Sequence, residues 1–82
     1  MKVIGVLTRV ARNEKGYGFI EIENSLRLDV GKNEERFVEL ERLVGRDVVV
    51  TVNTEWRSVD GKKFPSRRAI AVRPLDGDAI KI

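Results

Sequence analysis

Short runs of β-forming residues, separated by turn sequences, restrict this chain to a small β fold. Between Phe19 and Glu23 an aromatic or acidic residue alternates with isoleucine, and residues 26–30 alternate apolar with charged side chains. This period of two is typical of a strand that buries one face. Asn24-Ser25 lies between the two runs and has turn composition, so we expect two consecutive strands here.

Three further segments predict strands. Residues 2–10 are mostly β-branched and apolar, residues 47–56 hold a run of valines and threonines, and residues 68–73 form a last apolar run before Pro74. Asp60-Gly61 suits a turn that needs positive φ angles, so it predicts a hairpin between the last two strands.

The segment from 34 to 45 follows a different pattern. Apolar residues recur there at helical spacing among charged ones and end before Gly45: Phe37, Leu40, Leu43 and Val44. The pattern predicts a short helix or 3₁₀ turn. We expect Phe37 to plug one end of the sheet structure, and we interpret the acidic run from Glu34 to Glu41 as a solvated helix face.

Five strands with a helical insert between the third and fourth predict an all-β fold. The architecture that fits is a five-stranded antiparallel Greek-key barrel of the OB type. We expect the barrel to span residues 1–75 and residues 76–82 to form a short C-terminal tail. The middle strands of OB barrels commonly bind oligonucleotides, so strands two and three are the first place to expect a ligand.

Composition excludes several kinds of site. The 82 residues include no cysteine and no histidine, which excludes disulfides, the usual zinc sites and a His or Cys catalytic base. The serines lack an activating partner and no glycine-rich phosphate loop is present, so we expect neither an enzyme nor a bound cofactor. The apolar start of the chain is interrupted at Gly5 and is too short for a signal peptide or a membrane span. We therefore expect a cytoplasmic protein without a membrane partner.

The net charge of +3 is unevenly distributed along the chain. Residues 34–47 hold five acidic and three basic side chains, so the remaining residues carry five excess positive charges. That excess lies mainly in residues 9–15 and 62–68. If the fold brings these two segments together, they form a landing site for a polyanion.

The segment Lys15–Ile20 carries the most specific pattern, Lys-Gly-Tyr-Gly-Phe-Ile. Tyr17 and Phe19 are two residues apart, so their rings are expected on one face of a strand, while Ile20 faces inward. Bases stack on such rings with about 1–3 kcal/mol each, and Lys15 is placed to contact phosphate. The alternative is a partly buried aromatic pair that covers the sheet.

This hexapeptide resembles the first RNP motif of the cold-shock domain family. Residues 43–48 and 69–75 are similar to the family's entry into strand four and to its closing strand, and the likeness covers most of residues 3–75. The resemblance implies a single-stranded RNA- or DNA-binding protein of low sequence specificity. It also implies a role in RNA chaperoning or in the regulation of transcription or translation.

The chain departs from the family on strands one and three. The family's second RNP motif has an outward Phe and His, where this chain has Arg27 and Asp29. The family's exposed Trp on strand one corresponds to Arg9 or Val10. The aromatic platform is therefore reduced, and we expect binding that is weaker and more dependent on charge.

A second contact zone is predicted in the 62–68 loop, where four basic residues surround Phe64, with Trp56 nearby. The alternatives are a solvated hairpin tip for the loop and, for Trp56, packing at the barrel end. The complete predicted binding set is Arg9, Arg12, Lys15, Tyr17, Phe19, Arg27, Trp56, Lys62, Lys63, Phe64, Arg67 and Arg68. The rival hypothesis is a protein-interaction OB module that docks on a larger nucleic-acid machine, such as RNA polymerase or the ribosome, through residues 34–42.

Overall fold

The computed structural model describes all 82 residues and is mostly β, with one short helix. The elements in chain order are β1 (Lys2–Arg12), β2 (Gly18–Ile22), β3 (Leu26–Gly31), α1 (Glu34–Glu41), β4 (Asp47–Val59), β5 (Lys62–Pro74) and β6 (Ile80–Lys81). The five predicted strands and the helical insert between the third and fourth are therefore confirmed. No helix is long and apolar enough to cross a membrane.

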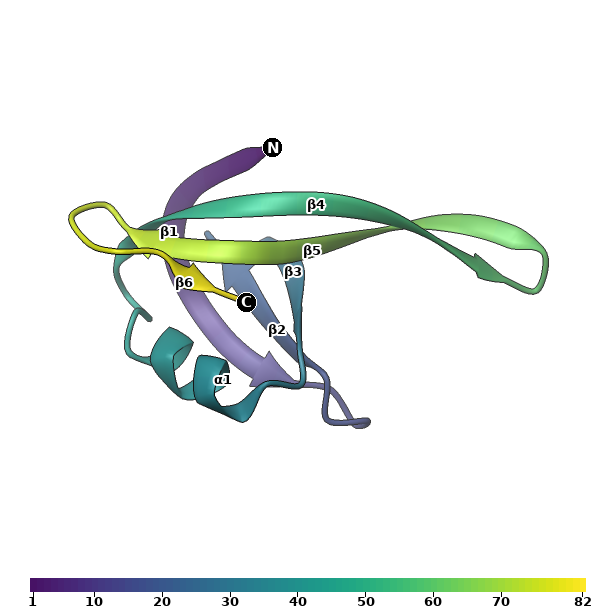
Figure 1. Ribbon diagram of the computed structural model, residues 1–82, viewed down its shortest axis with the longest axis horizontal. Helices are drawn as coiled ribbons and strands as arrows, with labels where there is room; N and C mark the ends of the chain where they lie inside the picture. The colour runs from purple at the N-terminus through teal and green to yellow at the C-terminus, as the bar shows by residue number, and fades with distance from the viewer.

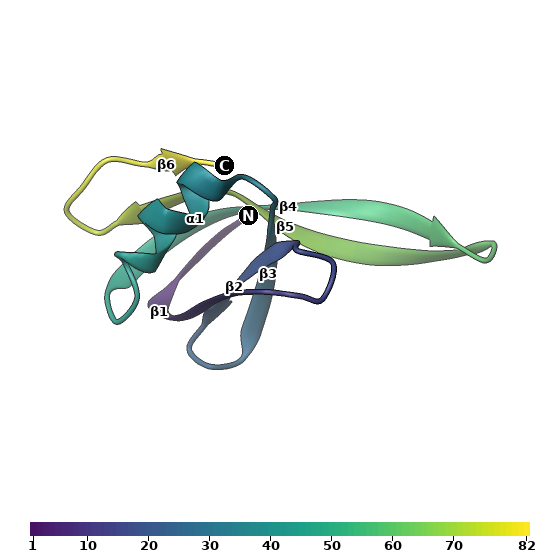
Figure 2. The same ribbon diagram turned by 90° about the horizontal axis from the view of Figure 1, so that it is seen from below.

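The five long strands hydrogen-bond in a ring. β1 pairs antiparallel with both β2 and β4, β2 pairs with β3, and β4 pairs with β5. A parallel contact between Asp29 on β3 and Arg68 on β5 completes the ring. This bonding is compatible with an all-β barrel, and Figures 1 and 2 show the strands curving around a common interior.

The interior holds the residues that the period-two pattern places inward. Leu7, Ile20, Leu28, Val48, Val50 and Val72 are fully buried and belong to one core cluster. No polar or charged side chain is buried. The core of the fold is therefore entirely apolar, as expected for a chain with neither disulfides nor histidine or cysteine metal ligands.

Helix α1 packs against the core. Its N-cap, Asn33, accepts a hydrogen bond from the Arg36 N–H at 3.2 Å, and Leu40 is fully buried. Phe37 lies outside the core cluster, where its ring packs against Arg12. The half-buried Phe37 ring also lies against Gly18, where β2 begins beside the end of β3, so it covers the strand ends there as predicted, while Leu40 is the helix residue that enters the core.

The C-terminal residues are more than a tail. β6 pairs with β5 through Ala71 opposite Lys81 and Val72 opposite Ile80. Ile80 and Ile82 pack against the core. Residues 76–82, expected as a short C-terminal tail, therefore include a short sixth strand at the edge of β5.

The last hairpin is much longer than predicted. β4 and β5 stay paired from Asn53 opposite Arg68 to Val59 opposite Lys62, and we name this stretch, residues 53–68, the arm. Figure 1 shows the arm projecting well beyond the other strands, consistent with overall extents of 43 × 25 × 22 Å. The turn at its tip is the predicted one, with φ of 52° at Asp60 and 77° at Gly61.

Two predictions for this region were wrong. Residues 62–68 are not a loop but the first half of β5. Trp56 does not cap the barrel, because it lies on the arm with 67% of its surface exposed. Trp56 is on the same face of β4 as the buried Val48, Val50 and Val52. That face is not covered at Trp56, because no other strand lies over that part of the hairpin.

Candidate nucleic-acid interface

The turn between β1 and β2 is held rigidly by Asn13. The Asn13 side-chain oxygen accepts hydrogen bonds from the N–H groups of Lys15 and Tyr17, each at 3.0 Å. The Asn13 N–H donates to the Tyr17 carbonyl at 2.9 Å, and Gly16 supplies the positive φ of 83° that the turn needs. The turn therefore presents Lys15 and Tyr17 in a defined place, just before β2 begins.

Tyr17 is available at the surface. Its ring is about half exposed, and the Lys32 ammonium lies 4.4 Å from the ring centroid. A cation beside an aromatic ring is attracted by the ring quadrupole. An aromatic ring of the kind on which bases can stack and an ammonium group of the kind that can neutralise a phosphate therefore lie in contact with each other.

Phe19 lies on the outer face of β2, as its parity predicts, but it is not an open ring. Only 6% of its surface is exposed. The Arg27 guanidinium covers it at 3.7 Å from the ring centroid, and Arg9 approaches at 5.5 Å. The expectation of a bare stacking ring was therefore wrong. Arg27 on β3 lies diagonally across from Phe19, within reach of a long side chain, so its guanidinium, and not the ring, is exposed at this place.

A cleft of about 280 Å³ separates the β1–β2 turn from the base of the arm. It is lined by Asn13, Lys15, Tyr17, Asp29, Gly31, Arg57 and Arg68. Three of these side chains are basic and one is acidic. The sequence prediction missed Arg57. It lies next to Trp56 in a segment rich in β-formers, and nothing in that pattern indicates that the arm curves toward the turn.

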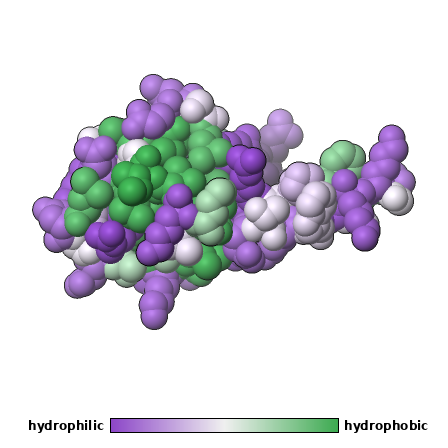
Figure 3. Space-filling model, turned by 90° about the horizontal axis from the view of Figure 1, so that it is seen from above, coloured by the Kyte–Doolittle hydropathy of each residue, from purple (hydrophilic) through white to green (hydrophobic).

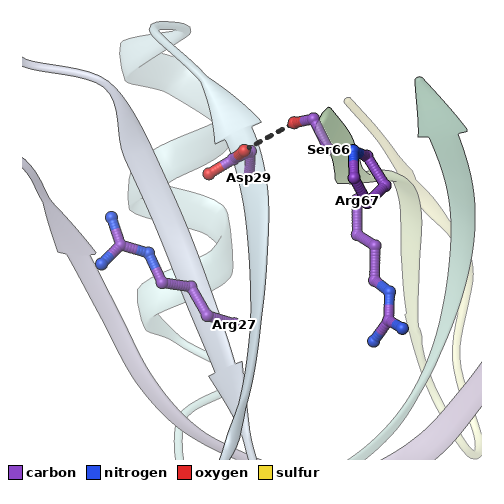
Figure 4. A pocket seen from close by; sticks show the side chains of 5 residues that line it. Arg27, Asp29, Ser66 and Arg67 are labelled. Carbon is purple, nitrogen blue, oxygen red and sulfur yellow. Dashed lines mark hydrogen bonds between the residues drawn. The ribbon is translucent and has the colours of Figure 1, made fainter. Parts of the chain in front are cut away.

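A second hollow of about 420 Å³ lies beside the cleft and is lined by Arg27, Asp29, Pro65, Ser66 and Arg67. Figure 4 shows the Asp29 carboxylate pointing to Ser66, whose hydroxyl donates a hydrogen bond to it at 3.2 Å. The Arg27 side chain extends the other way, across the neighbouring strand. Asp29 thus links β3 to the arm by a hydrogen bond. Its carboxylate shares the hollow with two arginines, Arg27 and Arg67.

A third hollow, of about 500 Å³, is lined by Arg12, Asn13, Glu14, Lys15, Phe19 and Arg27. It shares Asn13 and Lys15 with the cleft and Arg27 with the second hollow. The three hollows are therefore neighbours, and we name them together the basic groove. Its lining includes six basic residues (Arg12, Lys15, Arg27, Arg57, Arg67 and Arg68) and two acidic ones (Glu14 and Asp29).

Arg12 is less available to a ligand than the other cations. Its guanidinium donates to both carboxylate oxygens of Glu34, at 2.6 Å for Nη2–Oε2, and packs 4.2 Å from the Phe37 ring centroid. The hydrogen bonds from Arg12 lower the pKa of the Glu34 carboxyl below its ordinary value. The pair fastens α1 to the end of β1, so Arg12 acts mainly as a structural contact.

The Arg12–Glu34 pair leads to a prediction about pH. Because the folded-state pKa of Glu34 is lowered, the pair stabilises the fold above the ordinary value of 4.5. This contribution is lost as the pH falls through the lowered pKa. An NMR titration is expected to show the Glu34 midpoint rising toward 4.5 in an Arg12→Ala variant. An Arg42→Ala variant serves as the control, and an unchanged midpoint in Arg12→Ala would contradict the assignment.

The fold brings most of the predicted binding residues to one side and leaves the others apart. Those in or beside the basic groove are Arg9, Arg12, Lys15, Tyr17, Phe19, Arg27, Arg67 and Arg68. Trp56, Lys62, Lys63 and Phe64 lie farther out on the arm and do not line the groove. The predicted second contact zone is thus two places: the base of the arm, which joins the groove, and its outer part, which does not.

No protein-family model, curated protein or solved structure matches this chain. What the basic groove can bind is therefore inferred from its own residues. Ammonium and guanidinium groups neutralise phosphates, and the Tyr17 ring and the Arg27 guanidinium offer planar faces to bases.

Proposed function

We propose that this protein is an OB-type Greek-key barrel that binds single-stranded RNA or DNA in the basic groove, with low sequence specificity. The observation that carries the proposal is that three neighbouring hollows share a mostly basic lining. The three hollows share residues, and around Tyr17 their lining has two acidic and six basic side chains, one of which is Arg27. A flexible polyanion with planar bases complements such a surface better than a compact small molecule does.

The proposed roles divide between phosphates and bases. Lys15, Arg57 and Arg68 neutralise phosphates along the cleft, because their charged groups converge there from the turn and the arm. Bases stack on Tyr17 and on the Arg27 guanidinium, which lies over the Phe19 ring. Every base has a π face and every nucleotide has a phosphate, so these contacts discriminate little between sequences.

The strand order supports the OB assignment. In the ring, β1 lies between β2 and β4, and β3 meets β5 in parallel. The outer faces of β2 and β3 form the floor of the groove, and OB barrels bind oligonucleotides on their middle strands. The resemblance to cold-shock domains supports a cellular role in RNA chaperoning or in the regulation of transcription or translation, in the cytoplasm, without catalysis.

A second candidate is a protein-interaction module on a larger nucleic-acid machine. The observation that favours it is an apolar area on the outer face of β1 and β4, where Ile4 lies opposite Val49. Ile4 and Met1 are 69% and 68% exposed. Figure 3 shows apolar side chains gathered on this side of the molecule. A partner protein could cover this face and leave the basic groove free.

Titration of labelled single-stranded RNA and DNA oligonucleotides tests the main proposal. Wild type is expected to bind, and a Tyr17→Ala/Arg27→Ala variant is expected to bind at least tenfold more weakly, since about 1–3 kcal/mol is lost per stacked base. Both side chains are exposed, so the variant keeps its fold. If the wild type and the variant bind with equal weakness at all salt concentrations, the groove is not a working site. The second candidate would then take its place.

A further inference from the structure

The arm has a shape that the barrel does not explain. Apart from the parallel bridge between Arg68 and Asp29 of β3, its strands run from the Asn53–Arg68 pair to the Val59–Lys62 pair with no third strand paired to them. At about 3.3 Å per residue this is a projection of roughly 20 Å. An isolated two-stranded hairpin is at best marginally stable in water. We therefore expect a ligand that contacts both faces of the arm to stabilise it.

The arm carries the whole net charge of the protein. Residues 53–68 include five basic and two acidic side chains, whereas the other 66 residues include eleven of each. The barrel by itself is therefore neutral, and the projecting hairpin has a charge of +3. Such a distribution complements a polyanion that lies around the arm and not only against the barrel.

Both faces of the arm present the same chemistry. On one face Trp56 lies opposite Pro65, with Lys63 at the next paired position on that face. On the other face Phe64 lies opposite Arg57, with Lys62 at the next position. Trp56 and Phe64 are 67% and 51% exposed. A partner that used only one face would leave an aromatic ring and a set of cations in water on the other.

We propose that the arm inserts into the major groove of double-stranded DNA. That groove has two anionic walls, which meet the cations on the two faces of the ribbon. At about 12 Å wide it admits a two-stranded β-ribbon, and apolar side chains can contact thymine methyl groups there. The major groove of an RNA duplex is too deep and narrow for side chains. The residues particular to this site are those of the outer arm, Trp56, Lys62, Lys63 and Phe64, which lie outside the basic groove, whereas the three arginines of the arm line that groove as well.

Trp56 makes the proposal directly measurable, because it is the only tryptophan in the chain. An unlabelled B-form DNA duplex is expected to change the Trp56 emission and to protect it from acrylamide quenching. An RNA duplex of the same sequence is expected to leave both almost unchanged at the same concentration. Equal protection by the two duplexes would overturn the proposal, because it would mean attraction to phosphates without groove insertion. An absence of any change with the DNA duplex would overturn it as well.

A pair of charge-matched variants gives the second test. Lys62→Ala/Lys63→Ala is expected to weaken binding to the DNA duplex about tenfold and to reduce the slope of log K against log salt by about two. Lys2→Ala/Lys81→Ala removes the same charge from exposed positions on strands β1 and β6 and is expected to change neither. Equal losses in the two variants would overturn the proposal.

The outcomes separate this inference from the single-strand proposal. Tyr17→Ala/Arg27→Ala is expected to lose binding to single strands while Trp56 remains protected by the DNA duplex. If the proposal of single-strand binding in the basic groove fails, single strands do not bind, but the DNA duplex still protects Trp56. Failure of the arm proposal would appear as single-strand binding without duplex-dependent protection of Trp56.

Discussion

Replacing Arg57 and Arg68 together by glutamate is expected to weaken the binding of single-stranded oligonucleotides roughly a hundredfold near physiological salt. Both side chains line the cleft opposite Lys15 and Tyr17. The two substitutions remove two phosphate ligands and add two negative charges that repel the same phosphates. The effect is expected to be largest at low salt and to be measured by fluorescence anisotropy across a salt series.

The matched control reverses two exposed cations elsewhere on the protein, Lys2→Glu/Lys81→Glu. This variant undergoes the same change in net charge, but its substitutions lie on β1 and β6, outside the three hollows. We expect it to weaken binding only a few-fold, through the long-range field, which salt screens over about 10 Å at 0.1 M. A hundredfold loss in this control would show that net charge, and not the cleft, determines affinity.

Leu28→Ala is expected to lower the free energy of unfolding by about 2–5 kcal/mol. Leu28 is fully buried on β3 within the single core cluster. Its truncation removes apolar contacts and leaves a cavity in a small interior with few other sources of stability. Because domains of this size have limited reserves, the variant is expected to be partly unfolded at moderate temperature. Urea denaturation monitored by circular dichroism measures the change.

Leu75→Ala is the control, because it makes the same chemical change at a position that is 55% exposed. We expect it to alter stability by no more than about 0.5 kcal/mol. Similar effects of the two substitutions would contradict the placement of Leu28 in the core.

The basic groove differs in kind from an all-aromatic platform. Phe19 is present, but Arg27 lies on it at 3.7 Å, so the ring orders a cation instead of meeting a base directly. An arginine at this position replaces an aromatic contact with one that is both planar and charged. Affinity in such a groove is expected to fall steeply with salt, because a larger share of it comes from phosphate neutralisation.

Local sequence patterns were enough to predict most of the elements. The alternation in residues 19–23 and 26–30 identified two strands and assigned Ile20 and Leu28 to the interior, which the structure confirms. The Asp60-Gly61 pair identified the hairpin turn, because few residues tolerate two successive positive φ angles. These features depend on backbone geometry and side-chain parity within a few residues, so the chain encodes them locally.

Only the tertiary structure decided which of those residues meet. A valine- and threonine-rich strand has the same pattern whether or not a third strand covers it, so the sequence did not show where β4 leaves the barrel and becomes the arm. Parity assigned Phe19 to the outer face, but its burial depends on Arg27 from the neighbouring strand. Arg57 lines the cleft only because the arm leaves the barrel beside the β1–β2 turn. Arg12 is held in an ion pair by Glu34, which is 22 residues away in the sequence. Each of these is a non-local contact, set by how strands pair and curve around the core. Periodicity therefore determined the elements and their faces, and the closure of the ring determined the site.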